Sequence, residues 1–589
     1  REAGEILYDL TITENHAADI HKAYLVLARP VNDLSLQVLP NFREGDAIVL
    51  YQRNQDTDNV TNKMVFKGNI ERITDRDIRI RLRASQQNTS VLPLDSCYAI
   101  EHDYMDTSFR SMYLGLSAFL SANKDRRDLL LSQREPDFDT SFDARIAAAS
   151  DDFSRITLKA QAARDYFLLI GPPGTGKTSR ALRGMVEAFY REGKQILLLS
   201  YTNRAVDEIC KTLSVITPEI DFIRIGSELS CDPPFRSRLI ENVLESCSTR
   251  REVHARIERC RVFVGTVATF SSKTDMFRLK TFDVAIVDEA TQILEPQLLG
   301  LLCARNVAGN NAIGKFILIG DHKQLPAVVL QSESQSEVCE ECLQSIGLYN
   351  LKDSLFERLY RTVSANHSSP TTQRFYDMLC RQGRMNVEVA RFPNHAFYGG
   401  LLEAVGLPHQ QGELVLAPGL ESDEFADVLV SRVAFLPSVP EFPSQSAKIN
   451  HFEARLTARL AASVYRQYEA SNSGFNSALT LGVITPYRSQ IALIKREIAA
   501  LGIPVLNDIL VDTVERFQGS ERDVIIYSFC VNRTYQLKFL ANLTEEKGVW
   551  IDRKLNVALT RARKQLFMTG VPHLLRQNPI YADLLDTVL

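Results

Sequence analysis

The sequence predicts an α/β protein that has two tandem domains, each built on a mostly parallel β-sheet, with a small antiparallel β-barrel and a helical stalk placed before the strands of the first of these domains. Short strands with alternating apolar residues occur before residue 105. From residue 167 onward, apolar strands alternate with amphipathic helices, and a second set of such strands begins near residue 479. Strands that alternate with helices are typical of doubly wound parallel sheets.

The composition is that of a globular chain. Of 589 residues, 45% are hydrophobic and 24% are charged, which excludes a disordered tail, a collagen-like fibre and a disulfide-stapled miniprotein. No apolar run reaches the roughly 18 residues of a membrane span, so we expect no membrane partner. The net charge of −4 does not by itself indicate nucleic-acid binding, which has to be argued from local patches. Ten irregularly spaced cysteines favour a reducing intracellular setting, cytoplasmic with the nucleus left open.

Five regions follow from these patterns. Strands expected over 47–51, 64–73 and 78–82 indicate the barrel, and a Leu- and Arg-rich helical pattern follows it. The strands of the α/β domains are expected over 167–170, 196–199, 262–264, 284–287, 316–319, 479–484, 524–529 and 566–569. The predicted regions are a lead-in (1–20), the barrel (21–105), the stalk (106–135), the first α/β domain (136–359, with a helical insertion at about 228–260) and the second (360–589).

A phosphate-binding loop follows the first apolar strand of the α/β region. Its residues are Gly171, Pro172, Pro173, Gly174, Thr175, Gly176, Lys177 and Thr178, with Ser179 next to them. They match G-x-x-x-x-G-K-[ST] between a strand and a helical run, the context that the motif requires. Glycines let the backbone curl around phosphate oxygens and present its N–H groups. Lys177 is expected to reach the β- and γ-phosphates of ATP, and Thr178 to offer its hydroxyl to Mg²⁺.

Two carboxylates end a later apolar strand. Asp288 and Glu289 follow the residues 282–287. Because side chains alternate along a strand, the two should diverge and take different roles. We expect Asp288 to hold Mg²⁺ through water and Glu289 to polarise the attacking water. The alternative is an acidic pair that begins a helix.

At this point the chain resembles superfamily-1 helicases. It is most similar to the branch that holds the RNA helicase of nonsense-mediated decay and the helicase part of the replication-associated nuclease–helicase. The resemblance is carried by nine stretches in family order: 171–178, 200–207, 287–292, 320–326, 354–359, 382–386, 484–490, 511–521 and 555–563. It implies two RecA-like domains of the phosphate-loop NTPase type, with ATP and Mg²⁺ between them.

The resemblance also implies roles for single residues. Gln324 would sense the γ-phosphate, while Arg384 and Arg561 would reach across from the second domain as arginine fingers. Planar, permanently charged donors suit the charge that spreads over a transferring phosphoryl group. Glu521 would bind the ribose, and Gln161 is the nearest candidate for a glutamine that reads the base. Where the family usually has an adenine-stacking aromatic residue, this chain has Gly383, so the sequence leaves the choice of base open.

The same resemblance implies a single-stranded track across both domains. The positions that match strand-contacting motif segments are Thr202, Asn203, Thr266, Thr485 and Thr513. Short hydroxyl and amide groups suit phosphate oxygens, although strand propensity or helix capping accounts for each threonine taken alone. The barrel resembles the accessory domain of the 5′→3′ branch.

The barrel contains a run of alternating arginines. Period two places Arg79, Arg81 and Arg83 on the strand face opposite to Ile78 and Ile80. Three guanidinium groups on one face are suited to a phosphate backbone. A solvated outer barrel face accounts for the pattern equally well.

The function expected from these observations is an ATP-dependent single-strand translocase and helicase, acting as a monomer on DNA or RNA with a duplex junction. DNA and 5′→3′ movement are favoured. The alternative is a nucleotide-gated clamp that unwinds little. What precedes Arg1, and whether the chain is fused to or acts with a nuclease, is left open by the sequence.

Overall fold

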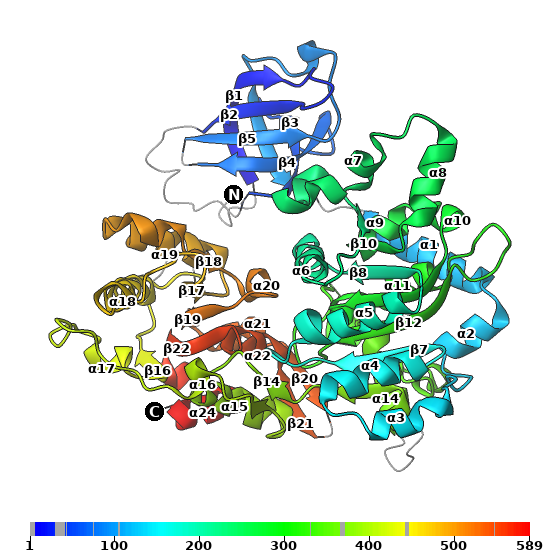
Figure 1. Ribbon diagram of the computed structural model, residues 1–589. Helices are drawn as coiled ribbons and strands as arrows, with labels where there is room; N and C mark the ends of the chain where they lie inside the picture. Colours follow the sequence, from blue (N-terminus) through cyan, green and yellow to red (C-terminus); the bar gives the residue numbers. More distant parts are fainter. Residues whose placement is uncertain are drawn as a thin grey trace.

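The computed structural model describes residues 6–29, 42, 44–74, 76–103, 107–329, 331–365, 372–441, 447–546 and 548–588. Within them, two α/β domains lie side by side and an antiparallel barrel lies above them (Figure 1). Each α/β domain has a parallel sheet, which confirms the predicted fold class. No helix in these ranges is long and apolar enough to cross a bilayer.

The barrel closes in the order β1-β2-β5-β4-β3-β6. Its strands are β1 (Ile6–His16), β2 (Tyr24–Ala28), β3 (Ala47–Gln52), β4 (Val65–Ile73), β5 (Asp77–Leu82) and β6 (Cys97–His102). The expected lead-in over 1–20 is therefore wrong from Ile6 onward. β1 pairs with both β2 and β6, and without it the barrel would stay open. Only Leu10 and Ile12 of β1 are buried apolar residues, a weak signal in the sequence.

The stalk consists of α1 (Thr107–Ser121) and α2 (Lys124–Leu130), and it packs on the first α/β domain. A Cβ atom at Gly115 of α1 would lie 2.0 Å from the carbonyl oxygen of Pro296, so only glycine permits this close approach. The buried Arg126 of α2 donates to the backbone oxygens of Ile313 (2.8 Å) and Gly314 (2.7 Å). These contacts attach the stalk to the start of a central strand.

The first α/β domain has a parallel sheet in the order β13-β7-β12-β11-β8-β10-β9. The strands are β7 (Tyr166–Ile170), β8 (Ile196–Ser200), β9 (Phe222–Ile225), β10 (Val262–Thr266), β11 (Phe282–Asp288), β12 (Ile313–Gly320) and β13 (Tyr376–Met378). Alternate residues of β7 enter opposite cores, Phe167 on one face and Leu168 on the other. Both faces are therefore covered, as the continuous apolar runs predict.

Helices cover both faces of this sheet. The helices of this domain are α3 (Asp143–Ala147), α4 (Asp152–Ala162), α5 (Arg183–Arg191), α6 (Asn203–Ser214), α7 (Ile240–Leu244), α8 (Arg250–Arg259), α9 (Val267–Ser272), α10 (Met276–Leu279), α11 (Glu295–Leu302), α12 (Glu333–Ser336), α13 (Glu341–Gln344) and α14 (Leu355–Ala365). β13 pairs with β7, so the first sheet extends beyond the expected boundary near residue 360. This strand has only three residues, too few for a sequence pattern to show.

The second α/β domain has a parallel sheet in the order β16-β22-β19-β17-β18. Its strands are β16 (Val433–Pro437), β17 (Leu481–Ile484), β18 (Leu510–Asp512), β19 (Arg522–Ser528) and β22 (Ala562–Gly570), with the short pairs β14 (Arg381–Gln382)–β15 (Glu403–Ala404) and β20 (Leu543–Glu546)–β21 (Val549–Asp552) beside it. Its helices are α15 (Val387–Tyr398), α16 (Pro408–Gln411), α17 (Ala426–Leu429), α18 (His451–Ala470), α19 (Arg488–Ala500), α20 (Val514–Phe517), α21 (Leu537–Leu540), α22 (Arg553–Leu559), α23 (Pro572–Leu575) and α24 (Pro579–Val588).

Candidate active site

A cavity of about 980 Å³ lies between the two α/β domains, at the carboxyl end of β7. The phosphate loop forms one wall, and residues 172–179 line it. Gly174 and Gly176 have φ angles of +72° and +79°, a left-handed conformation that favours glycine. The space that a Cβ at Gly171 would take holds the Lys177 side chain, 2.7 Å away. The glycines therefore supply the backbone shape that the sequence motif predicts.

Thr178 and Asp288 meet in this cavity. The Thr178 hydroxyl donates to Asp288 Oδ2 over 2.7 Å, although the two residues are 110 positions apart. Burial raises the pKa of Asp288, and the neighbouring charge of Glu289 adds to that effect. Hydroxyl and carboxylate oxygens are the hard ligands that Mg²⁺ prefers, together with substrate phosphates and water. The donor set thus fits a magnesium ion bound with a nucleotide. No cluster of three or more potential acidic, His or Cys ligands occurs among the described residues.

Glu289 lies between a lysine and two glutamines. Its Oε1 is 2.9 Å from Lys177 Nζ, and its Oε2 accepts hydrogen bonds from Gln292 (2.8 Å) and Gln518 (3.3 Å). Burial alone would raise the pKa of Glu289, but the charge of Lys177 holds it below its usual value. Its φ of +56° is a strained conformation for a residue with a side chain. The carboxylate is therefore ionised and held at the phosphate loop.

Gln324 and Arg561 meet across the domain boundary. Arg561 Nη2 donates to Gln324 Oε1 over 3.1 Å, and Gln324 Nε2 donates to Asp321 over 2.8 Å. Both side chains are buried and line the cavity. Burial, with the charge of Arg384, lowers the pKa of Arg561 to about 9, so the guanidinium is still charged at neutral pH. The geometry brings both predicted residues to the nucleotide cavity.

Arg384 lines the cavity but is directed to a carboxylate of its own domain. Its Nε lies 2.5 Å from Glu521 Oε2, and its Nη1 donates to the backbone oxygen of Thr560 (3.3 Å). In this arrangement Glu521 acts as the partner of Arg384. A reach across the cleft would require this ion pair to open. The preceding residue, Gly383, donates its backbone N–H to the oxygen of Gly174 over 2.9 Å, which brings the second domain onto the phosphate loop.

Gln161, the predicted reader of the base, lies outside the nucleotide cavity in this structure. Gln161 lies at the carboxyl-terminal end of α4, where its side-chain amide donates to Glu192. It is not among the residues that line the cavity. The start of α4 lines it instead, through Asp151, Asp152 and Phe153. The reason is the helix itself, because Gln161 lies nine residues beyond Asp152, about 13.5 Å along the axis at 1.5 Å per residue.

The five residues predicted to contact a single strand lie at, or just after, the carboxyl ends of parallel β-strands. Thr202 and Asn203 begin α6, and Thr266 caps α9. Thr485 comes after β17, and Thr513 precedes α20. Thr202 is exposed, whereas Thr266 and Thr485 are 5% and 0% exposed. Contact of these two hydroxyl groups with a strand would require neighbouring residues to move.

Arg79 and Arg81 of β5, and Arg83 directly after this strand, are paired with carboxylates. Arg79 and Arg81 lie 3.1 and 3.3 Å from Glu71, and Arg83 lies 2.9 Å from Asp103. They are on the outer barrel face, as the alternation predicts, because Ile78 and Ile80 fill the inside. Their charge is therefore partly compensated within the barrel.

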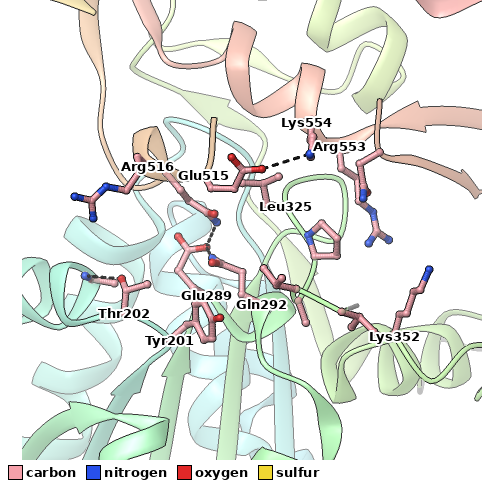
Figure 2. A pocket seen from close by; sticks show the side chains of 18 of the residues that line it. Tyr201, Thr202, Glu289, Gln292, Leu325, Lys352, Glu515, Arg516, Arg553 and Lys554 are labelled. Carbon is pink, nitrogen blue, oxygen red and sulfur yellow. Dashed lines mark hydrogen bonds and ion pairs between the residues drawn. The ribbon is translucent and has the colours of Figure 1, made fainter. Parts of the chain in front are cut away.

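A second cavity, of about 500 Å³, also has Glu289 in its lining (Figure 2). Its walls include Tyr201 and Thr202 of the first domain and Arg516 and Lys554 of the second; Lys554 pairs with Glu515 over 3.4 Å. Glu289 lines both cavities, and so does Arg204. Sequence reasoning missed Gln518 as a partner of Glu289, although it lies within the matched stretch 511–521.

Two family models match the α/β domains in chain order. One, described as an AAA domain, matches residues 149–258 and 236–332. The other, also described as an AAA domain, matches residues 351–573. Together they contain the phosphate loop and every predicted second-domain residue of the nucleotide site.

Curated relatives match most of this chain. The DNA replication ATP-dependent helicase/nuclease JHS1 of Arabidopsis thaliana is 28% identical over 571 residues, which are 93% of this chain and 38% of that protein. The DNA replication ATP-dependent helicase/nuclease DNA2 of Bos taurus is 27% identical over 579 residues, 92% of this chain and 49% of that protein. The chain therefore spans less than half the length of these two relatives.

Among solved structures, a crystal structure of Arterivirus nonstructural protein 10 (helicase) is similar over 94% of this chain and 78% of that chain. The TM-score is 0.35 and the sequence identity is 12%. A complex of the same viral protein with DNA gives a TM-score of 0.34 at 14% identity, over 71% of this chain and 63% of that chain.

Proposed function

We propose that this chain, which belongs to superfamily 1 of the helicases, uses ATP to move along single-stranded nucleic acid and to separate duplexes. The observation that carries the proposal is the contact between Arg561 and Gln324 at the nucleotide cavity (3.1 Å). A site completed from two domains makes hydrolysis depend on domain closure, so that each nucleotide cycle can drive motion.

The residues of the cavity divide the chemistry between them. When the triphosphate binds, Lys177 exchanges Glu289 for the phosphate oxygens, and Glu289 then orients and deprotonates the attacking water. Arg561 neutralises the charge that develops on the transferred group. Mg²⁺, held by Thr178 and Asp288, would neutralise charge on the phosphates. Arg384 is proposed as a second arginine finger once its pair with Glu521 opens, which leaves Glu521 to bind the ribose.

A strand in the second cavity would influence hydrolysis directly. Glu289 lines this cavity as well as the nucleotide cavity, and its neighbours there include the exposed Thr202. Contacts between such side chains and the phosphate backbone of the nucleic acid hold a strand without reading its sequence, as a translocase requires. Thr202, Asn203 and Thr513 are the proposed first contacts, and Thr266 and Thr485 become accessible only after a rearrangement.

DNA is the proposed track, because the two curated relatives reported above are named as DNA replication helicase/nucleases. We also propose that the protein moves in the 5′→3′ direction and acts as a monomeric motor in a reducing intracellular compartment. It would cooperate there with a nuclease. The ten cysteines, all of which the structure describes, are free thiols, which is compatible with such a compartment.

Single-stranded DNA is expected to raise the rate of ATP hydrolysis at least about tenfold. A strand bound in the second cavity would fix the residues around Glu289, which also lines the nucleotide cavity. The measurement is the steady-state rate with and without oligonucleotides of DNA and RNA. A 5′-tailed duplex should be separated with ATP but not with a non-hydrolysable analogue, and a 3′-tailed duplex should remain intact. If neither DNA nor RNA changed the rate of hydrolysis, the proposed motor function would be contradicted. If DNA raised the rate but the duplex strands were not separated, the nucleotide-gated clamp would be favoured.

The barrel arginines give a separate prediction. If Arg79, Arg81 and Arg83 contact a phosphate backbone, their joint replacement by alanine reduces the slope of log binding constant against log salt concentration by about 0.7 per lost contact for single strands. Binding is measured by fluorescence anisotropy at several salt concentrations. A joint replacement of Arg250 and Arg251, which are exposed on α8, is the matched control. An unchanged slope would show that these arginines belong to a solvated face.

A further inference from the structure

The hairpin β20–β21 lies at the boundary between the two α/β domains (Figure 1). It belongs to the second domain and immediately precedes α22, the helix that leads to Arg561. Its two faces differ. Glu545 and Trp550 pair across the hairpin and are exposed, whereas Glu546 is directed toward the first domain.

Glu546 contacts two residues of the first domain. Both of its carboxylate oxygens are 3.2 Å from His322 Nε2, and Oε2 is also 3.2 Å from Lys323 Nζ. Burial opposes ionisation, but the hydrogen bond from His322 and the charge of Lys323 lower the pKa of Glu546 to about 2. His322 and Lys323 are themselves largely buried, with 11% and 21% of their side chains exposed. This is a charge-assisted contact that solvent screens only in part.

His322 and Lys323 directly precede Gln324 in the loop after β12. Although the loop leaves a strand of the first domain, the second domain holds it at several points. The Tyr398 hydroxyl donates to Asp321 (2.7 Å), and Asn556 donates to the backbone oxygen of Lys323 (2.7 Å). With Arg561 on Gln324, each residue of the loop 321–324 contacts the second domain.

We propose that Glu546 is a positioning residue for nucleotide hydrolysis, acting through His322 and Lys323 on the placement of Gln324. The proposal rests on the proposed function, because it assigns to Gln324 the contact with the γ-phosphate. Because Glu546 and the loop 321–324 belong to different domains, the contact requires the two domains to be together, and it would add a condition to hydrolysis. Displacement of a positioned group by about 1 Å can cost on the order of 10² in rate. Loss of one of several anchors should cost less.

The test is the substitution Glu546→Gln in the full chain, which keeps the shape and removes the charge. We expect kcat for ATP hydrolysis, measured with saturating single-stranded DNA, to fall about tenfold while KM for ATP changes by less than about twofold, the pattern of an interaction made only in the transition state. Glu545→Gln, on the exposed face of the same hairpin, is the matched control and should leave both constants unchanged.

A second comparison separates positioning from a structural role. Glu546→Gln and His322→Gln together should lower kcat no further than the larger single effect, because coupled residues are not additive. An unchanged kcat in Glu546→Gln, equal losses in kcat and nucleotide affinity, or additive effects of the two substitutions would overturn the proposal. Failure of the proposed function is distinguishable, since it would appear as strand-independent hydrolysis in the unsubstituted chain.

Discussion

Lys177→Ala is expected to lower the rate of ATP hydrolysis by about 10³-fold, because it removes a fixed cation from the position where charge develops. The structure gives this substitution a second effect. Lys177 Nζ is 2.9 Å from Glu289 and is the group that holds the pKa of this buried carboxyl down. Without it, the pKa of Glu289 rises, and more of the carboxyl is protonated and unable to accept a proton from water.

The measurement is single-turnover hydrolysis at saturating ATP, which separates chemistry from binding. Lys194→Ala, at an exposed position of the same domain, is the control for loss of a lysine and should hydrolyse ATP at the normal rate. Because the raised pKa of Glu289 is part of the loss, residual activity should increase as the pH rises. Activity within about tenfold of normal would rule out Lys177 as the main phosphate ligand.

Arg561→Ala is expected to lower hydrolysis by about 10³ to 10⁵, the usual effect of an arginine finger. Nucleotide binding should be nearly retained, because the phosphate loop belongs to the other domain. Arg561→Lys should restore little, since an ammonium group lacks the planar arrangement of donors that contacts Gln324 and a phosphoryl oxygen together.

Single-turnover rates and the affinity for a fluorescent nucleotide together test this prediction. Arg576→Ala is the matched control, because Arg576 pairs with Asp586 on the surface of the same domain. Equal losses of affinity and rate would show that Arg561 binds the nucleotide in the ground state and would remove its role as a finger.

Several site residues were predictable because their chemistry depends on local sequence. The phosphate loop needs glycine at left-handed positions and a lysine at the start of a helix, and both requirements are visible in residues 171–178. Asp288 is likewise recognisable at the end of a buried strand. The position of Gln161 depends on the length of α4, which places its side chain outside the cavity and beside Glu192.

Contacts between residues that are far apart in the sequence were not predictable in this way. The ion pair of Arg384 with Glu521 joins residues 137 positions apart, and that of Glu546 with His322 joins residues 224 apart. The strands β1 and β13 were not predictable for a related reason. Each is defined mainly by its pairing with a neighbouring strand, because its own residues show little strand pattern.

The two parallel sheets, the phosphate loop and the groups able to bind a triphosphate can be predicted from the residues alone, because periodicity and backbone conformation are local properties. Which of these groups contact one another depends on tertiary packing. It placed Arg561 on Gln324 and directed Arg384 to Glu521. It also brought the hairpin β20–β21 to the loop before Gln324. Such choices depend on how two separately folded domains pack, and no short stretch of sequence encodes that packing.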